Sequence, residues 1–171
     1  GSTNGEPSTY SACEHGNAIL SRYPLGNAGA IRHRDNVSWY TPLEDRGTGG
    51  FSTRLGGRIT VYADAQIGDS YLHLYSLHFS SDFGSSDVRA SQAEEIVEHA
   101  AGYTSPVIVG GDTNAFFYAA DVSSGMQTDD VTGAFLTNGY SDAHSPLEFE
   151  DRYTCDGAMN SQPIIDLIFG K

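Results

Sequence analysis

Short apolar runs separated by turn-forming residues dominate this chain, and they predict more strands than helices. Strands are expected at 17–20, 58–63, 71–78, 106–110, 152–155 and 164–169. Gly68 and Asp69 lie between two of these runs and predict a hairpin turn. Residues 1–15 are expected to be loop, and the glycine- and arginine-rich residues 26–53 a long surface excursion. The pattern therefore indicates a sheet-based fold.

Two segments favour helices. Residues 87–101 carry apolar positions at helical spacing, with N-cap candidates before them and Gly102 directly after. A shorter helix is expected at about 128–137, where Gly139 follows its end, and loop is expected at 115–131. Strands followed by a strand–helix–strand segment predict a single mixed α/β (α+β) domain over residues 1–171.

Composition narrows the class of protein. The chain has 171 residues, of which 39% are hydrophobic and 18% charged. No apolar run approaches the roughly 20 residues of a membrane helix, so no transmembrane segment is expected. The net charge of −13 argues against a protein that coats nucleic acid non-specifically. Arginines are concentrated in residues 1–60, which are therefore the better candidate for contacting phosphates, although a solvated surface is the alternative.

The two cysteines, Cys13 and Cys155, are too few for a zinc cluster. A disulfide between them would suit a secreted or periplasmic protein, and the near absence of lysine points the same way. Two free thiols in a cytoplasmic protein are the alternative.

Polar residues at strand ends supply the candidate chemistry. His78 closes one apolar run, and Asp112 and Asn114 follow another through two glycines that are expected to turn the backbone sharply. Asp166 lies inside an apolar strand, where a carboxylate is costly unless it is paired or bound to a cation. Alternatives are an Asx-type turn at 112–114 and an ordinary surface histidine. Together the four residues fit metal-assisted phosphoryl transfer.

Five motifs resemble those of the endonuclease/exonuclease/phosphatase superfamily, which includes deoxyribonuclease I. They occur in the family's order, at 16–24, 74–78, 89–92, 111–114 and 165–169. The resemblance implies a four-layer α/β/β/α sandwich of the deoxyribonuclease I-like type. It also implies hydrolysis of phosphate esters that depends on Mg²⁺, or on Mn²⁺ or Ca²⁺. The substrate could be a nucleic acid, a phospholipid headgroup or an inositol phosphate.

The resemblance also implies roles for individual residues. His78 would contact the phosphate or assist the leaving group, and Asp112 would orient or activate water near the metal. Asn114 would hold a phosphate oxygen, while Asp166 would orient a second histidine. Arg22, in the first motif, is a candidate for substrate binding.

Arg89 and Gln92 lie three residues apart on the predicted helix. By the same resemblance, they would tie that helix to the strands of the active site. Their expected role is structural support.

Parts of the family pattern are missing. The upstream strand with the metal-binding glutamate and the final S-D-H strand have no counterpart, so the fold is expected to be incomplete at both ends. Residues 141–144 include Asp142 and His144 but resemble a different family segment. The chain could be a fragment, a pared-down homologue, or one part of a sheet completed by a second chain or swapped copy. Alone it is expected to hydrolyse slowly. The alternative function is a non-catalytic binding or interaction module.

Overall fold

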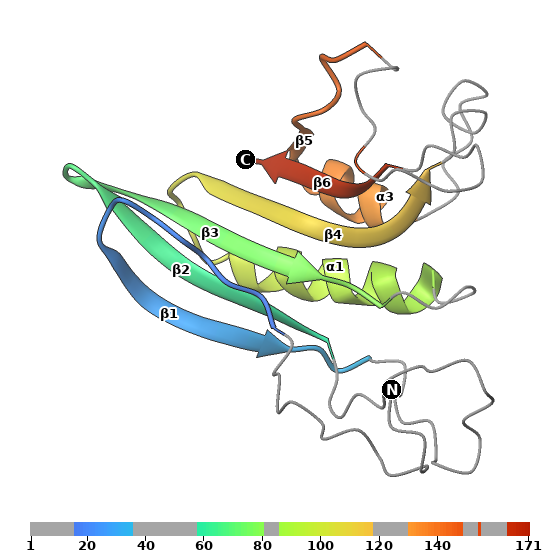
Figure 1. Ribbon diagram of the computed structural model, residues 1–171, viewed down its shortest axis with the longest axis horizontal. Helices are drawn as coiled ribbons and strands as arrows, with labels where there is room; N and C mark the ends of the chain where they lie inside the picture. Colours follow the sequence, from blue (N-terminus) through green and yellow to red (C-terminus); the bar gives the residue numbers. More distant parts are fainter. Residues whose placement is uncertain (1–15, 36–57, 81–85, 118–129, 149–153, 155–163) are drawn as a thin grey trace, which may run out of the picture.

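The computed structural model describes residues 16–35, 58–80, 86–117, 130–148, 154 and 164–171. They form a mixed six-stranded sheet and two helices (Figure 1). The elements are β1 (Leu25–Arg32), β2 (Ile59–Ile67), β3 (Ser70–His78), α1 (Ser86–Ala100), β4 (Val107–Phe117), α3 (Asp130–Thr137), β5 (Ser141–Asp142) and β6 (Ile164–Gly170). The strand order is β1-β2-β3-β4-β6-β5. Neighbouring strands are antiparallel except for β3 and β4, which are parallel and are connected through α1.

Both helices cover the same face of the sheet, called here the helix face (Figure 1). Leu77 of β3 and Val109 of β4 are buried there against Ile96 of α1. Phe135 of α3 stacks on Phe169 of β6, with 4.4 Å between ring centroids. Because side chains alternate along a strand, the intervening residues point to the opposite face. Neither described helix has the length and apolar character needed to cross a bilayer.

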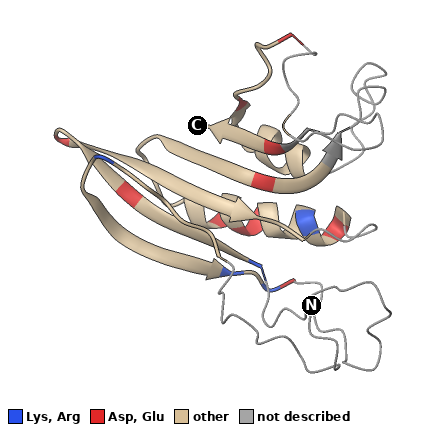
Figure 2. Ribbon diagram, in the orientation of Figure 1, with Lys and Arg blue, Asp and Glu red and all other residues tan. Residues whose placement is uncertain are grey.

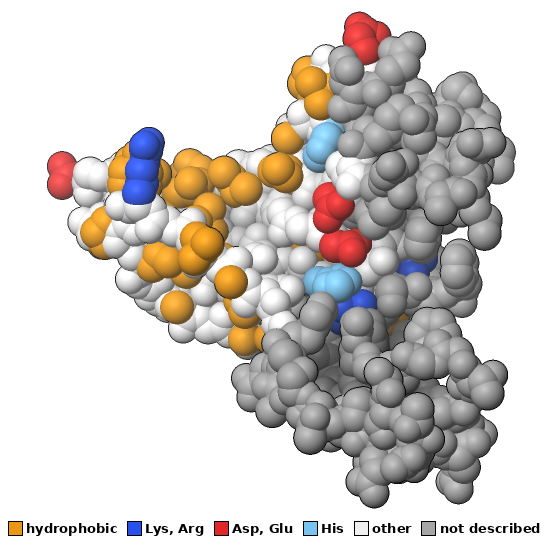
Figure 3. Space-filling view, in the orientation of Figure 1, with side chains coloured by type: hydrophobic (Ala, Val, Ile, Leu, Met, Phe, Trp, Pro, Cys, Tyr) orange, Lys and Arg blue, Asp and Glu red, His pale blue; other side chains and the backbone are white. Residues whose placement is uncertain are grey.

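The opposite face, called here the open face, has no helix over it among the described residues. Its apolar side chains come from four strands and include Val61, Leu72, Leu74, Ile108 and Ile168. Ile108 and Ile168 are 38% and 47% exposed. Figure 3 shows hydrophobic side chains on this face beside a group of acidic and histidine side chains. The described residues thus form one sheet with helices on one face, and the second sheet of the expected four-layer sandwich is not among them.

The first strand lies later in the sequence than predicted. Residues 17–20 form no regular structure, although the Asn17 amide donates hydrogen bonds to backbone carbonyls of β2 and β3. β1 instead occupies the start of the expected excursion at 26–53. Its glycines and alanines are weak strand formers, so the hydrophobic pattern does not predict a strand there. Gly29 is nonetheless suited to its place, because a Cβ there would lie 2.4 Å from the Tyr62 hydroxyl.

Most other elements lie where the pattern predicts them. Gly68 and Asp69 form the hairpin turn, with Gly68 at a φ of 63°. The two helices agree with prediction to within about two residues, and β6 covers the final apolar run. Cys13 and Cys155 lie outside the described residues, so their disulfide stays a prediction. The same holds for most of the strand expected at 152–155 and most of the loop expected at 115–131.

β4 is longer than predicted and does not end at its two glycines. It continues to Phe117, with φ values of 139° at Gly111 and 48° at Asn114. Its pairing with β6 is irregular between Asp112 and Phe117. The predicted sharp turn is therefore wrong: the glycine allows an irregular strand that keeps its neighbours in the sheet.

A buried histidine joins the end of β1 to α1. His33 Nδ1 lies 3.0 Å from Glu95 Oε2, and its Nε2 lies 2.9 Å from the Thr60 hydroxyl. The other Glu95 oxygen accepts hydrogen bonds from the backbone and side chain of Arg34. Burial lowers the pKa of His33, although Glu95 opposes the shift. Burial raises the pKa of Glu95, but its bonds to Arg34 and His33 outweigh this and lower the pKa overall.

Acid should therefore weaken the fold in two ranges. The unfolded chain takes up a proton on His33 near pH 6.5, before the folded protein does, so stability falls as the pH drops below that value. Glu95 adds stability above pH 4.5 that is lost as the pH approaches its lower folded pKa. Urea unfolding measured from pH 7.5 to 5.5 should show a falling free energy of unfolding, and His33→Gln should flatten that dependence. An equally steep dependence in His33→Gln would contradict the assignment.

Candidate active site

Three of the predicted site residues lie side by side at one end of the sheet. β3 and β4 pair His78 with Asp112, and β4 and β6 pair Asp112 with Asp166. Because Leu77 and Leu167 beside them point to the helix face, these side chains point to the open face. Neighbouring strands lie about 4.8 Å apart, so the imidazole and the two carboxylates form a row. Figure 2 shows the acidic positions next to each other on β4 and β6.

One oxygen of Asp112 is used within the strand and the other faces the row. Oδ1 accepts a hydrogen bond from the backbone N–H of Asn114 at 2.8 Å. Oδ2 lies 3.4 Å from Nε2 of His78. The two side chains are 28% and 24% exposed, so both can be reached from solvent. The pair therefore combines a held orientation with access for a small ligand.

Asn114 fastens β4 to the residue that follows His78. Its side-chain NH₂ donates to the Phe79 carbonyl at 2.9 Å, and the residue is buried. Asparagine tolerates the positive φ found here better than most residues. The amide lies beside the row. That it holds a phosphate oxygen stays a prediction.

Both carboxyl groups of the row have a raised pKa. For Asp112 the main cause is burial, opposed by the Asn114 hydrogen bond and by the positive charge of Arg58. For Asp166 burial is again the main cause, and the negative charge of Asp112 adds to it. A hydrogen bond and nearby imidazoles oppose this second shift. Burial disfavours the ionised form of both carboxyl groups, and the charge of Asp112 adds to this at Asp166, so a bound cation would stabilise both ionised forms.

Asp112 and Asp166 are the residues that could hold a divalent cation. Mg²⁺ is often held in proteins by one or two carboxylates while it keeps several waters and binds substrate phosphate oxygens. A facing carboxylate pair fits that mode. Within the part of the chain that the structure describes, no group of three or more His, Cys, Asp or Glu side chains is placed to hold a metal.

α1 supports the segment that follows His78. Gln92 is fully buried, and its Oε1 accepts from the Ser80 backbone N–H at 3.1 Å. Its Nε2 donates to the Ser80 hydroxyl at 3.1 Å and to the Asp35 carbonyl at 2.8 Å. Arg89 donates to the Ser80 carbonyl at 3.4 Å. The two residues predicted to give structural support thus contact the backbone two residues beyond His78.

The structure does not bring Arg22 to this row. Its guanidinium donates to the Tyr23 hydroxyl at 3.3 Å and lies over that ring. The following residue, Pro24, accepts a hydrogen bond from Gln66, next to the β2–β3 hairpin turn. That hairpin lies at the opposite end of β3 from His78, so Arg22 and the row occupy different ends of the sheet.

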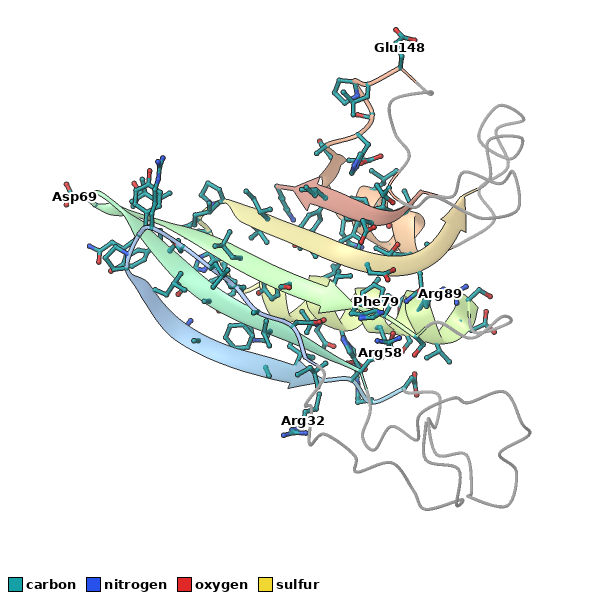
Figure 4. The ribbon with its side chains drawn as sticks, viewed as in Figure 1. Arg32, Arg58, Asp69, Phe79, Arg89 and Glu148 are labelled. Carbon is teal, nitrogen blue, oxygen red and sulfur yellow. The ribbon has the colours of Figure 1, made fainter. Side chains whose placement is uncertain are left out.

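Arg58 is the arginine whose charge acts on the row, and sequence analysis did not single it out. It directly precedes β2 and is buried. Figure 4 shows it near Phe79, at the end of the sheet opposite Asp69. Its positive charge favours the ionised form of Asp112. In the sequence it is one of several arginines in residues 1–60, and only the sheet distinguishes it from them.

The sequence matches no family model and no curated protein. The fold, in contrast, matches solved structures. The human Nocturnin catalytic domain, solved with a bound sulfate anion, is 16% identical over 86% of this chain and 47% of that chain, with a TM-score of 0.54. Truncated TDP2 from Caenorhabditis elegans is 13% identical over 87% of this chain and 53% of that chain, also with a TM-score of 0.54. At such identities the likeness shows a shared fold, and this chain spans about half the length of the structures that it matches.

Proposed function

We propose that this chain, whose fold matches that of members of the endonuclease/exonuclease/phosphatase superfamily, carries the active site of a divalent-cation-dependent hydrolase of phosphate esters. The observation that carries the proposal is the strand register that aligns His78, Asp112 and Asp166 on one face. An imidazole beside two carboxylates can exchange protons and hold a cation at one place, and metal-assisted hydrolysis of phosphate esters uses both.

The geometry suggests what each residue does. A phosphate ester would lie over the carboxylate pair, with His78 at one side to bind the phosphate or assist the leaving oxygen. Asp112 would orient the attacking water through Oδ2, because its Oδ1 is held by the backbone of Asn114. Arg58 would add positive charge near the phosphate. Asp112 and Asp166 would hold the divalent cation, whose charge would offset the negative charge of the phosphate oxygens.

The proposed substrate class is the phosphate ester, in a nucleic acid, a phospholipid headgroup or an inositol phosphate. The bound sulfate of the Nocturnin structure supports the class, because sulfate is a tetrahedral oxyanion like phosphate. The row supplies groups for the phosphate itself and not for one particular alcohol or base. We also propose that a second chain or a swapped copy of this chain completes the sheet.

The direct test is hydrolysis of bis-p-nitrophenyl phosphate by the purified chain. We expect slow release of nitrophenolate with Mg²⁺, its loss in EDTA, and its return when Mg²⁺ is added in excess. Product is followed by absorbance against a blank without protein. No hydrolysis with Mg²⁺, Mn²⁺ or Ca²⁺ would contradict the proposal and favour the non-catalytic binding module.

A further inference from the structure

We propose that His33 is a positioning residue of this site, which holds the Phe79 ring and thereby fixes the placement of His78 relative to Asp112. The inference rests on the proposed function and deepens it, because it names a residue outside the row on which the geometry of the row depends. In the sequence, His33 lies within the expected surface excursion at 26–53, where nothing distinguishes it.

Phe79 joins His78 to the neighbouring strand β4. It directly follows His78, and its backbone N–H donates to the Asp112 carbonyl at 2.9 Å. Its own carbonyl accepts from the Asn114 side chain at 2.9 Å. Because the peptide unit is stiff, a shift of Phe79 also moves His78 and changes the 3.4 Å distance from its Nε2 to Asp112 Oδ2. The place of the imidazole in the row therefore depends on how firmly Phe79 is held.

His33 packs against the Phe79 ring on the helix face. Both side chains are fully buried. Their ring centroids lie 5.7 Å apart and the ring planes meet at 80°, which is the favoured edge-to-face arrangement. Such a contact depends on the orientation of both rings, so a rotation of the imidazole would release the phenyl ring.

Two hydrogen bonds hold the imidazole in one orientation. Nδ1 lies 3.0 Å from Glu95 Oε2, and Nε2 lies 2.9 Å from the Thr60 hydroxyl. Burial raises the pKa of Glu95, but its hydrogen bonds outweigh this, so the carboxylate is ionised at neutral pH and can only accept. Nδ1 therefore carries the ring proton and donates to Glu95, while Nε2 accepts from the Thr60 O–H. The ring cannot rotate without breaking both bonds.

The two partners of the imidazole belong to elements that also serve the site. Glu95 is on α1, which bonds through Gln92 to the residue after Phe79. Thr60 is on β2, two residues after Arg58, whose charge acts on the row. Figure 4 marks this end of the sheet with the labels of Phe79 and Arg58. The imidazole thus connects the helix, the strand next to the arginine, and the residue next to the catalytic histidine.

A positioning role predicts a loss of rate that exceeds the loss of binding. Displacement of a reacting group by about 1 Å can lower a rate about 10²-fold. The carboxylates of Asp112 and Asp166 are aligned by the pairing of β4 with β6, so the Mg²⁺ dependence of the reaction should be kept. Removal of the link should therefore lower kcat and leave KM close to its wild-type value.

The test compares Thr60→Val with wild type, because valine keeps the shape of the buried threonine but cannot donate to the imidazole. Amide hydrogen exchange measured by NMR should be about fivefold faster or more at Phe79, as expected for the loss of one buried hydrogen bond. Exchange should be unchanged at His73, whose amide donates to the Pro106 carbonyl at the other end of β3. On bis-p-nitrophenyl phosphate with Mg²⁺, kcat should fall about 10-fold. Thr60→Ser keeps the hydroxyl and should restore most of the rate.

Tyr75→Phe is the matched control, since it removes another hydroxyl that bonds an imidazole between the sheet and α1. The Tyr75 hydroxyl lies 2.8 Å from His99 Nδ1. This variant should lose a similar amount of stability in urea unfolding. Its kcat and the exchange rate of its Phe79 amide should stay at the wild-type values.

The inference requires that both Phe79 exchange and kcat change in Thr60→Val. If either stays at the wild-type value while Asp112→Asn loses activity, this inference alone is overturned. Equal changes in Thr60→Val and Tyr75→Phe would show a general loss of stability and would overturn it as well. A wild type without cation-dependent hydrolysis would overturn the proposed function, and the role of His33 in that reaction with it.

Discussion

Asp112→Asn should lower the cation-dependent hydrolysis of bis-p-nitrophenyl phosphate by about 10³-fold, because the loss of a cation-binding charge removes several kcal/mol of transition-state stabilisation. The substitution keeps the shape of the side chain. The side-chain oxygen of the new asparagine can still accept the hydrogen bond from the Asn114 N–H, so the fold should be preserved. What is lost is the negative charge that faces His78 and Asp166. Steady-state rates over a range of Mg²⁺ concentrations measure the effect.

Asp69→Asn is the matched control for this loss of charge. Asp69 lies at the tip of the β2–β3 hairpin, at the opposite end of the sheet (Figure 4). This variant should keep the wild-type rate and the wild-type Mg²⁺ dependence. Equal activity in Asp112→Asn and Asp69→Asn would show that the carboxylate row is not the centre of the reaction.

Gly111→Ala should destabilise the protein by on the order of 3–5 kcal/mol, from a strained backbone conformation together with overpacking. The φ of Gly111 is 139°, which side chains rarely adopt. A Cβ would lie 2.2 Å from the Leu77 carbonyl oxygen, and that oxygen belongs to the backbone of the paired strand β3. Relief of the clash must therefore separate β3 from β4 next to His78 and Asp112. Urea unfolding measures the loss of free energy, and thermal unfolding should show a fall of roughly 10 °C in Tm.

Gly110→Ala tests whether this effect is specific to one glycine. A Cβ at Gly110 would lie 3.5 Å from the Ile168 side chain and 3.6 Å from the Leu167 carbonyl, which is ordinary contact. Its φ is outside the positive range. We expect a loss of under about 1 kcal/mol, the usual cost of a tolerated core change. If the two alanine variants were equally stable, the strained role of Gly111 would be wrong.

Local pattern predicted those elements whose side chains carry a strong signal. α1 has apolar residues at helical spacing, caps before it and Gly102 after it, and it forms within one residue of the expected ends. β1 carries little strand signal in its sequence. It lies at the edge of the sheet and is mostly exposed, so it buries few large side chains, and half of its residues are glycine or alanine. Residues 17–20 have the composition of a strand but no regular structure. Whether such a segment becomes a strand depends on which partner is available in the sheet.

The site residues could be proposed from sequence, but their arrangement could not. His78, Asp112 and Asp166 each interrupt or end an apolar run, which is a local signal. That they stand in one row depends on strand order and register, which long-range pairing decides. The same dependence explains why the sequence points to Arg22 and not to Arg58. The two arginines look alike in sequence, and only the sheet places one of them near Asp112.

The position of β6 has a consequence for how the protein acquires its site. β6 follows β5 in the chain but lies between β4 and β5 in the sheet. β5 therefore cannot join the sheet until β6 has paired with β4, and the same pairing brings Asp166 beside Asp112. Such long-range pairing forms late because a long loop must close first. Completion of the sheet and assembly of the carboxylate pair are thus one event, so a chain in which β6 has not paired holds His78 beside Asp112 but lacks the second carboxylate.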